Sequence, residues 1–415
     1  MLRTRLASLP ILATLLVSPI PSSAGELDDM RAALGEMQKL LQQQQARIDQ
    51  LEKQADAKPA TPESSVKQGG PLVLIPAAAP SPPSARPEPA LATLYGRLDL
   101  FAEGNWGGSK GSRVSIESGG MNGSRIGLKG GKAITPETHF IYQMEAGFFA
   151  NNGKLGQSDS NNTRIFGRQL YAGIDGQYGR LTVGRQYSPF FMGMIQFDAF
   201  ENGYGSPTNY GTVEPGPVRY DNAVVYATPR LRGLTSTLFA SLGGRTGGTE
   251  QNTLGLNLDY SNGPLGLGFA YQYDNHNAVL DKTTRHLFAG ASYQFGPVKL
   301  IGGLAGYDRQ PDIGALVEWR SWFLGSRIDV TPSGQLRLNY GEGHSLASQT
   351  DRGRIFSAAW METINAQFKA YLAWSRNLNQ PASALAPSGT SASGYYTINP
   401  GDTANGLAAG VQYVF

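Results

Sequence analysis

Hydrophobic and polar residues alternate with a period of two along most of the chain after residue 93. In 94–103, Leu94, Leu98 and Leu100 fall on one face of the expected strand and Arg97 falls on the other. Alternation of this kind predicts a β-strand with one apolar face. The pattern recurs in sixteen segments: 94–103, 124–130, 139–149, 164–175, 179–187, 218–226, 232–243, 251–261, 264–274, 284–295, 298–307, 315–329, 333–344, 353–363, 365–376 and 404–415. We therefore predict an all-β fold for this region.

The connections between these segments are of two kinds. Tight turns are expected at 176–179, 261–264, 295–297 and 331–334. Long polar or glycine-rich connections are expected at 104–112, 150–163, 188–217, 244–250, 275–283, 308–314, 345–352 and 377–403. An even number of strands with short turns at one end and long loops at the other is typical of outer-membrane barrels. The pattern predicts a 16-stranded antiparallel transmembrane β-barrel over 91–415. A soluble β-sandwich or propeller that buries the apolar face is the alternative.

The last nine residues favour the barrel over the soluble alternative. Counting back from the end in steps of two, Phe415, Tyr413, Val411 and Leu407 lie on one apolar face. A strand that ends the chain on an aromatic residue suits a membrane barrel, where one face meets lipid and aromatic residues gather at the interface.

The first 90 residues predict three different segments. Residues 1–24 have Arg3 and Arg5, a short apolar stretch and small residues at 22–24, which indicates a signal peptide cleaved near residue 25. A buried hydrophobic helix is the alternative. No later stretch reaches the roughly 18 apolar residues of a transmembrane helix. Residues 59–90 are rich in Pro and Ala, which predicts an extended linker.

Residues 25–58 predict a short α-helical coiled coil that precedes the barrel. Apolar residues recur in alternating steps of three and four, which is the spacing of a coiled-coil seam. The seam positions are Leu27, Met30, Leu34, Met37, Leu41, Gln44, Ile48, Leu51 and Ala55. Two- and three-stranded assemblies both fit, and a lone amphipathic helix packed on a globular partner remains an alternative.

Composition excludes several classes of function. The chain has no cysteine, so a disulfide scaffold and a cysteine-ligated metal site are excluded. A net charge of +3 without a basic run does not suit nucleic acid. The histidines at 139, 276, 286 and 344 show no metal-binding spacing, and no phosphate-binding loop occurs. We expect no cofactor, no metal and no enzyme activity.

Five motifs resemble strands of Gram-negative general porins. They are Leu-Tyr-Gly-Arg-Leu-Asp (94–99), Ser-Gly-Gly-Met-Asn-Gly-Ser-Arg-Ile-Gly-Leu-Lys-Gly (118–130), Phe-Gly-Arg-Gln-Leu-Tyr-Ala-Gly-Ile (166–174), Gly-Arg-Leu-Thr-Val-Gly-Arg-Gln-Tyr (179–187) and Val-Arg-Tyr-Asp-Asn-Ala-Val-Val-Tyr (218–226). The resemblance covers about 91–415. The segment before it resembles extensions of some substrate-selective porins.

The resemblance implies a homotrimer in the outer membrane, in which each subunit forms a water-filled channel for small hydrophilic solutes. It implies contact with outer-membrane lipid and lipopolysaccharide. It also implies that Tyr413 and Phe415 form a signal read by the outer-membrane assembly machinery. The coiled coil is then expected in the periplasm. A protein that acts as a structural scaffold or tether through the coiled coil is the alternative.

The resemblance further implies that the third long loop, 188–217, folds inward and narrows the channel. This loop carries Asp198, Glu201 and Glu214 and no basic residue. The basic cluster expected on the facing wall consists of Arg97, Arg125, Lys129, Arg168 and Arg219. Charges of opposite sign across a narrow channel bias which solutes pass. We expect a preference for anions, with substrate selectivity for carboxylates or phosphate as an alternative.

Three further residues are expected to hold the wall and the loop in place. Arg180 and Arg185 are candidates for anchoring the loop through carboxylates, and Glu145 is a candidate ion-pair partner for a wall arginine.

Overall fold

The computed structural model describes residue 39 and residues 90–157, 163–209, 212–213, 217–243, 252–277, 282–311, 314–390 and 392–415. The chain divides into two compact units, Met1–Ser81 and Pro82–Phe415, and the description concerns the second. The predicted signal peptide, coiled coil and linker therefore lie outside the described residues, apart from Lys39 and Ala90. In the described part of the chain, no helix is long and apolar enough to cross a membrane.

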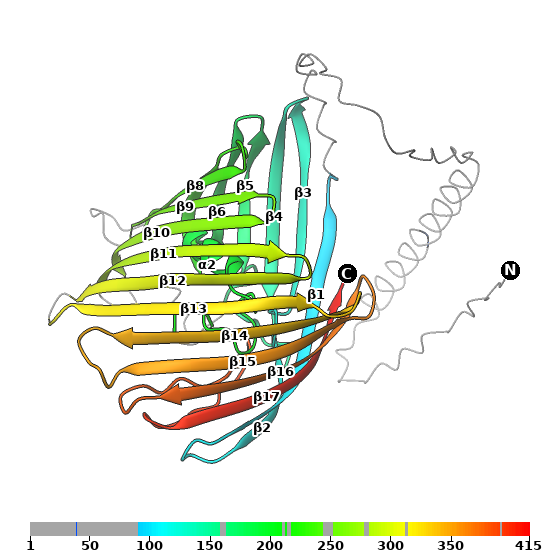
Figure 1. Ribbon diagram of the computed structural model, residues 1–415. Coiled ribbons are helices and arrows are strands. Elements are labelled where there is room, and N and C mark those ends of the chain that lie inside the picture. Colours follow the sequence, from blue (N-terminus) through cyan, green and yellow to red (C-terminus); the bar gives the residue numbers. More distant parts are fainter. Residues whose placement is uncertain are drawn as a thin grey trace, which may run out of the picture. The chain divides into compact units, whose positions relative to one another are not determined.

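Seventeen antiparallel β-strands form one closed barrel (Figure 1). From β3 to β17 each strand pairs with the next along the chain, and β1 pairs with β2, with β3 and with β17, which closes the sheet. The strands are β1 (Thr93–Trp106), β2 (Arg113–Ser118), β3 (Arg125–Thr135), β4 (Thr138–Gly147), β5 (Gln169–Gly176), β6 (Gly179–Tyr187), β7 (Arg219–Ala227), β8 (Leu234–Ser241), β9 (Thr253–Asn262), β10 (Leu265–Asn277), β11 (Lys282–Phe295), β12 (Val298–Pro311), β13 (Val317–Asp329), β14 (Gly334–Ser345), β15 (Arg352–Thr363), β16 (Phe368–Asn379) and β17 (Thr403–Val414).

β2 and β3 together occupy one strand position in the barrel wall, and each such position is called a stave below. Both pair with β1, β2 along 100–105 and β3 along 93–97. The barrel therefore has sixteen staves, which confirms the predicted 16-stranded antiparallel fold. The sequence pattern did not predict β2, because this stave is interrupted at 119–124.

A buried carboxylate organises this interruption. Asp99 on β1 is fully buried and accepts hydrogen bonds from the backbone N–H of Gly120, Met121 and Asn122 at 3.1, 3.1 and 2.7 Å. Tyr371 also donates to it, at 2.8 Å. Asp99 on β1 thus holds the segment 119–124 in place. The alternation of apolar and polar residues in the sequence does not indicate this arrangement.

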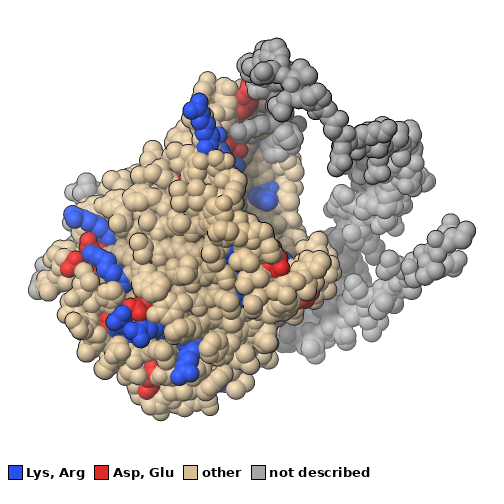
Figure 2. Space-filling model, in the orientation of Figure 1, with Lys and Arg blue, Asp and Glu red and all other residues tan. Residues whose placement is uncertain are grey.

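The outer face of the barrel is apolar. Leu407 and Val411 on β17 and Phe415 just after it are 44%, 56% and 43% exposed, whereas Ala408 and Gln412 between them are buried. The predicted apolar row at the end of the chain is therefore confirmed. Charged residues are sparse over the middle of β11–β15 and gather toward the ends of the strands (Figure 2). An apolar band around a polar interior is the arrangement that a bilayer requires of a barrel.

Aromatic residues gather where the chain ends. The ring centroids of Phe368 and Tyr413 lie 4.7 Å apart, and those of Tyr413 and Phe415 lie 5.8 Å apart. The Phe415 ring covers Gly96 on β1, where a Cβ would lie 2.2 Å from Phe415 Cζ. A glycine at 96 therefore lets the last residue of the chain pack across the closing seam.

The loop after β6 turns into the barrel and begins with the helix α2 (Pro189–Gln196) (Figure 1). Ser188 caps the helix by accepting from the N–H of Phe191, and Pro189 suits the first helical turn because its missing N–H needs no partner there. One face of α2 packs on β9, β10 and β11. A small hydrophobic core therefore forms inside the barrel, beneath the loop, and includes Phe190, Met194, Phe197, Phe288, Ile301 and Phe323.

Candidate channel constriction

The inward loop and the barrel wall enclose a cavity of about 590 Å³. The wall contributes residues of β1, β3–β7 and the end of β17 to its lining, together with the chain just before β3. The inward loop contributes residues of α2 and of the segment that follows it. All five residues of the predicted basic cluster line it, namely Arg97, Arg125, Lys129, Arg168 and Arg219. Two acidic residues, Glu145 and Glu201, share the lining. The structure thus brings together side chains separated by more than 100 residues.

Tyr187 connects the basic wall to the loop. Its hydroxyl accepts hydrogen bonds from Arg168 Nη2 at 2.5 Å and from Arg219 Nη2. The Arg219 guanidinium carbon lies 4.1 Å from the centre of the Tyr187 ring, and the Phe191 ring stacks on Tyr187 at 5.8 Å. These contacts hold two cations beside the start of α2.

Glu145 is engaged by its neighbours on the wall. Arg168 Nε donates to Glu145 Oε1 at 2.7 Å, and Tyr95 donates to Oε2 at 2.9 Å. Arg125 Nε lies 3.8 Å from the same Oε2. The buried carboxylate of Glu145 therefore balances the charge of Arg168. In the described part of the wall, most of the positive charge of the other basic residues is left unbalanced.

The other basic residues of the wall have fewer carboxylate partners. Within the described ranges, Arg97 and Lys129 have no carboxylate at ion-pair distance. Lys129 Nζ lies 5.2 Å above the Tyr95 ring. The buried Nε of Arg97 and that of Arg219 have no acceptor in the same part of the chain. The cavity therefore carries a net positive charge.

The acidic residues of the loop do not oppose this wall as a group. Asp198 is fully buried and belongs to the internal structure of the loop. Glu201 lies at the cavity, but two wall arginines form ion pairs with it. Arg327 Nη1 on β13 lies 3.0 Å from Glu201 Oε1, and Arg337 Nη1 on β14 lies 3.4 Å from Oε2. Glu214 lies outside the described residues.

Arg180 and Arg185 pair with carboxylates of the strands. Arg180 Nη2 lies 3.0 Å from Asp175 on β5, and Arg185 Nη1 lies 2.8 Å from Asp221 on β7. Arg185 Nε also donates to the carbonyl of Gly167 at 2.7 Å. These acceptors belong to the wall and not to 188–217, since both arginines extend along the sheet to neighbouring staves.

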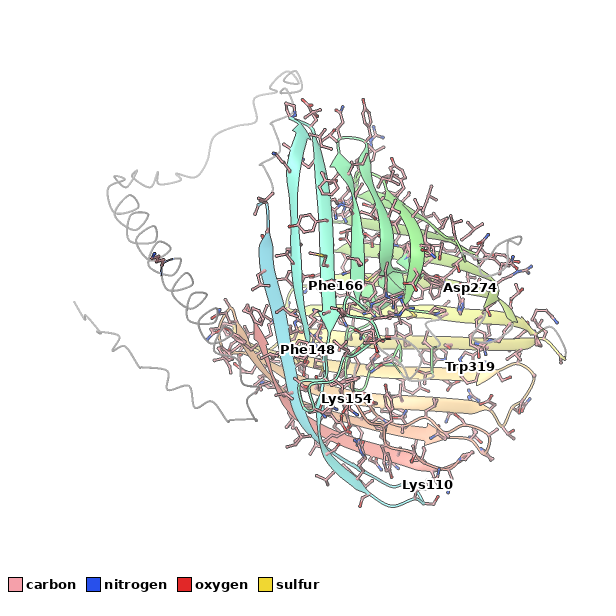
Figure 3. The ribbon with its side chains drawn as sticks, turned by 180° about the vertical axis from the view of Figure 1, so that it is seen from behind. Lys110, Phe148, Lys154, Phe166, Asp274 and Trp319 are labelled. Carbon is pink, nitrogen blue, oxygen red and sulfur yellow. The ribbon has the colours of Figure 1, made fainter. Side chains whose placement is uncertain are left out.

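Other wall residues hold the loop. Arg327 donates to the carbonyls of Ala199 and Asp198 at 2.9 and 2.7 Å. Ser357 donates to Gly205 O at 2.7 Å, and Trp319, labelled in Figure 3, donates to Thr212 O at 3.0 Å. The sequence pattern missed these anchors because the acceptors are backbone carbonyls, which any residue supplies.

One signal could have found Arg327 and Arg337. The two arginines are directly opposite each other on β13 and β14. Like charges in such a cross-strand pair destabilise a sheet unless an acid lies between them. Glu201 supplies that acid here. A pair of arginines on facing strands therefore predicts a carboxylate from elsewhere in the chain.

Comparison with known proteins decides the family. The sequence profile of the family described as Gram-negative porin matches residues 73–415. The chain belongs to the Gram-negative porin family. It is an outer-membrane channel and not an enzyme.

Two curated relatives and one solved structure illustrate the similarity. The porin is 32% identical to an outer membrane porin protein of Bordetella pertussis over 254 residues, which cover 55% of this chain and 62% of that protein. It is 26% identical to outer membrane porin protein 32 of Delftia acidovorans over 341 residues, 78% of this chain and 93% of that one. The anion-selective porin from Comamonas acidovorans superposes with a TM-score of 0.69 at 22% identity, covering 79% of this chain and all of that chain.

Glu201 makes the porin's response to pH predictable. Burial alone would raise the pKa of Glu201, but the guanidinium groups of Arg337 and Arg327 outweigh it and hold the pKa below its ordinary value. Glu201 thus stays charged from neutral pH down through the ordinary glutamate range. Its protonation at still lower pH removes a negative charge from the constriction and releases the ion pairs that hold the loop.

We therefore expect the ratio of anion to cation permeability to rise only below the ordinary pKa of a glutamate. Reversal potentials of single channels in a salt gradient, recorded as the pH is lowered, measure this ratio. The Glu201→Gln variant should start from the higher ratio and lack that part of the rise. A wild-type rise that begins near neutral pH would contradict the role of Glu201.

Proposed function

We propose that this porin conducts small hydrophilic solutes with a preference for anions, and that the basic cluster at the constriction sets this preference. The observation that carries the proposal is the pair Arg97 and Arg125, which are directly opposite each other on β1 and β3. A like-charged pair costs stability in a sheet, and here, among the described residues, only Arg125 has a carboxylate at ion-pair distance, Glu145 at 3.8 Å. The charge of Arg97 at the cavity therefore favours a role in conduction. Arginine keeps its charge at any relevant pH, so the preference persists at neutral and alkaline pH.

Similar proteins support two parts of the proposal. The porin from Comamonas acidovorans is described as anion-selective, and OmpT of Vibrio cholerae, a fold neighbour with a TM-score of 0.59 at 13% identity, occurs in a trimer form. We propose that this porin likewise forms a homotrimer whose outer face contacts outer-membrane lipid and lipopolysaccharide. Tyr413 and Phe415 serve as the signal for the assembly machinery. From the heptad spacing of the sequence alone, we further propose that removal of 1–24 leaves 25–58 as a periplasmic coiled coil, with 59–90 as a linker.

The proposal is tested by the sign of the reversal potential. Purified full-length porin is inserted into a planar bilayer with a tenfold gradient of potassium chloride. We expect a potential of the sign set by chloride, because the described constriction carries more basic than acidic side chains. A potential of the opposite sign would refute the anion preference. A purified barrel without ion conductance would refute the channel function and favour a scaffold.

A further inference from the structure

The constriction has a second property, which is that the side of α2 facing the cavity is apolar. Met192 and Ile195 line the cavity together with Phe191 and Val218. Met192 is 45% exposed, although the other face of the same helix is already packed in the core beneath the loop. Residues three apart lie on one face of a helix, so Met192 and Ile195 form a continuous apolar surface.

Met192 is not required by the packing of the loop, whereas Ile195 is half-buried and also packs against the core beneath it. Phe190, Met194 and Phe197 already bury the core-facing side of the loop, each with at most 1% exposure. At Gly268 and Gly290, a Cβ would lie 2.2 and 2.6 Å from the Phe197 ring, so this packing is close. Large apolar side chains that remain in contact with water often mark a binding surface.

Among the described residues, the cavity lining combines unpaired cations with this apolar surface. Asp198 is buried in the loop and Glu201 is bound by arginines of β13 and β14. The same lining includes Arg97 and Lys129, which have no carboxylate partners in the described part of the chain. A solute in the cavity therefore meets cations as well as hydrocarbon and a thioether.

We propose that the constriction selects amphiphilic organic monoanions, in which one carboxylate is attached to an aromatic or branched aliphatic body. The carboxylate accepts hydrogen bonds from the guanidinium groups of Arg97 and Arg125, which suit carboxylates because they are planar and present several donors. The apolar body lies against Met192 and Ile195, and thioethers make favourable contacts with aromatic rings.

Two other classes of anion fit less well. A small anion such as acetate gains only the contact with the basic wall. A dicarboxylate places its second charge against Met192 and Ile195, where a carboxylate loses hydration without gaining a donor from either side chain. This inference rests on the proposed anion preference and extends it by naming the substrate class.

The wild-type test compares phenylacetate, acetate and succinate with chloride in bi-ionic reversal potentials. In a channel that selects by charge and size alone, phenylacetate passes less readily than acetate because it is larger. We expect phenylacetate to pass at least as readily as acetate, and succinate to pass least. Phenylacetate should also reduce the chloride current at a lower concentration than acetate does. A wild-type channel in which phenylacetate passes less readily than acetate overturns the inference.

The variant test removes the apolar surface and keeps the arginines. In Met192→Asn/Ile195→Asn, the ratio of phenylacetate to acetate permeability should fall roughly fourfold, since about one methylene-sized contact is lost. Met192→Leu is the matched control, which keeps an apolar side chain of similar size and should keep the ratio. An unchanged ratio in the double variant overturns the inference.

The two proposals fail in different ways. If the wild-type channel prefers chloride over potassium but discriminates against phenylacetate, the inference is wrong and the proposed function stands. If the channel prefers potassium, the proposed function is wrong and the inference falls with it.

Discussion

Replacing Arg97 and Arg125 together by glutamine is expected to remove most of the anion preference of the channel. The two side chains face the same cavity from adjacent staves, and Arg97 has no carboxylate partner within the described ranges. In water, a charge about 6 Å from the path of an ion changes its energy by roughly 0.7 kcal/mol before screening by salt. The effect has opposite sign for anions and cations, so losing both charges changes the ratio of their permeabilities by about 2.8 kcal/mol before screening. Screening at about 0.1 M salt reduces this to about 1.5 kcal/mol, which is a roughly tenfold change in the ratio.

The measurement is the reversal potential in a potassium chloride gradient, with single-channel conductance as a check that the channel is open. Arg180→Gln/Arg230→Gln is the matched control. It removes the same number of charges from side chains that are 52% and 57% exposed and absent from the cavity lining. We expect the control to retain the wild-type potential. Equal shifts in both double variants would show that the overall charge of the protein, and not the constriction, sets the preference.

Replacing Asp198 by alanine is expected to release the inward loop and widen the channel. The carboxylate accepts hydrogen bonds from the N–H of Phe200 and Asn202 at 2.9 and 2.7 Å and from Ser206 Oγ and Thr208 Oγ1 at 2.5 and 2.9 Å. Each buried donor left without an acceptor costs about 1–3 kcal/mol. The loop can relieve this cost only by exposing these donors to water, which requires leaving its present conformation.

The expected result is a larger and noisier single-channel conductance, with faster swelling of liposomes in sugar solutions. The barrel itself should remain folded, because its strands pair with one another independently of the loop. Glu137→Ala is the matched control, since it removes an acid that is exposed in the turn between β3 and β4. A variant at Asp198 with wild-type conductance and wild-type solute cut-off would show that other anchors, such as Arg327 and Ser357, suffice.

The two acids of the loop that the structure describes show where sequence reasoning stops. Asp198 and Glu201 lie three residues apart in the same loop, and the sequence predicts the same role for both. The structure buries Asp198 inside the loop and places Glu201 between Arg327 and Arg337. A strand period indicates which way a side chain points, whereas a loop has no period, so the orientation of its side chains depends on the whole chain.

The strands are predictable because one face of each strand contacts lipid and the other face contacts water. Lipid outside and water inside demand alternating side chains in every stave, and this demand appears in the sequence as a period of two. The same period places Arg97 and Arg125 on the inner face. The period does not predict β2, because the segment 119–124 interrupts the alternation. That segment is held by hydrogen bonds from its backbone N–H groups to Asp99, which leave no side-chain pattern in the sequence.

Reading the residues alone is enough to predict that this chain forms a 16-stranded barrel, that its apolar row ends on Phe415, and that a basic cluster faces inward. These properties are local, since each follows from the alternation within one strand. What the cluster faces depends instead on how the chain folds in space. Closure of β17 onto β1 and the inward turn of α2 bring Met192 and Ile195 into the same cavity as the arginines, and direct Glu201 to β13 and β14. The character of the constriction depends on contacts between distant segments, which no periodicity within a strand encodes.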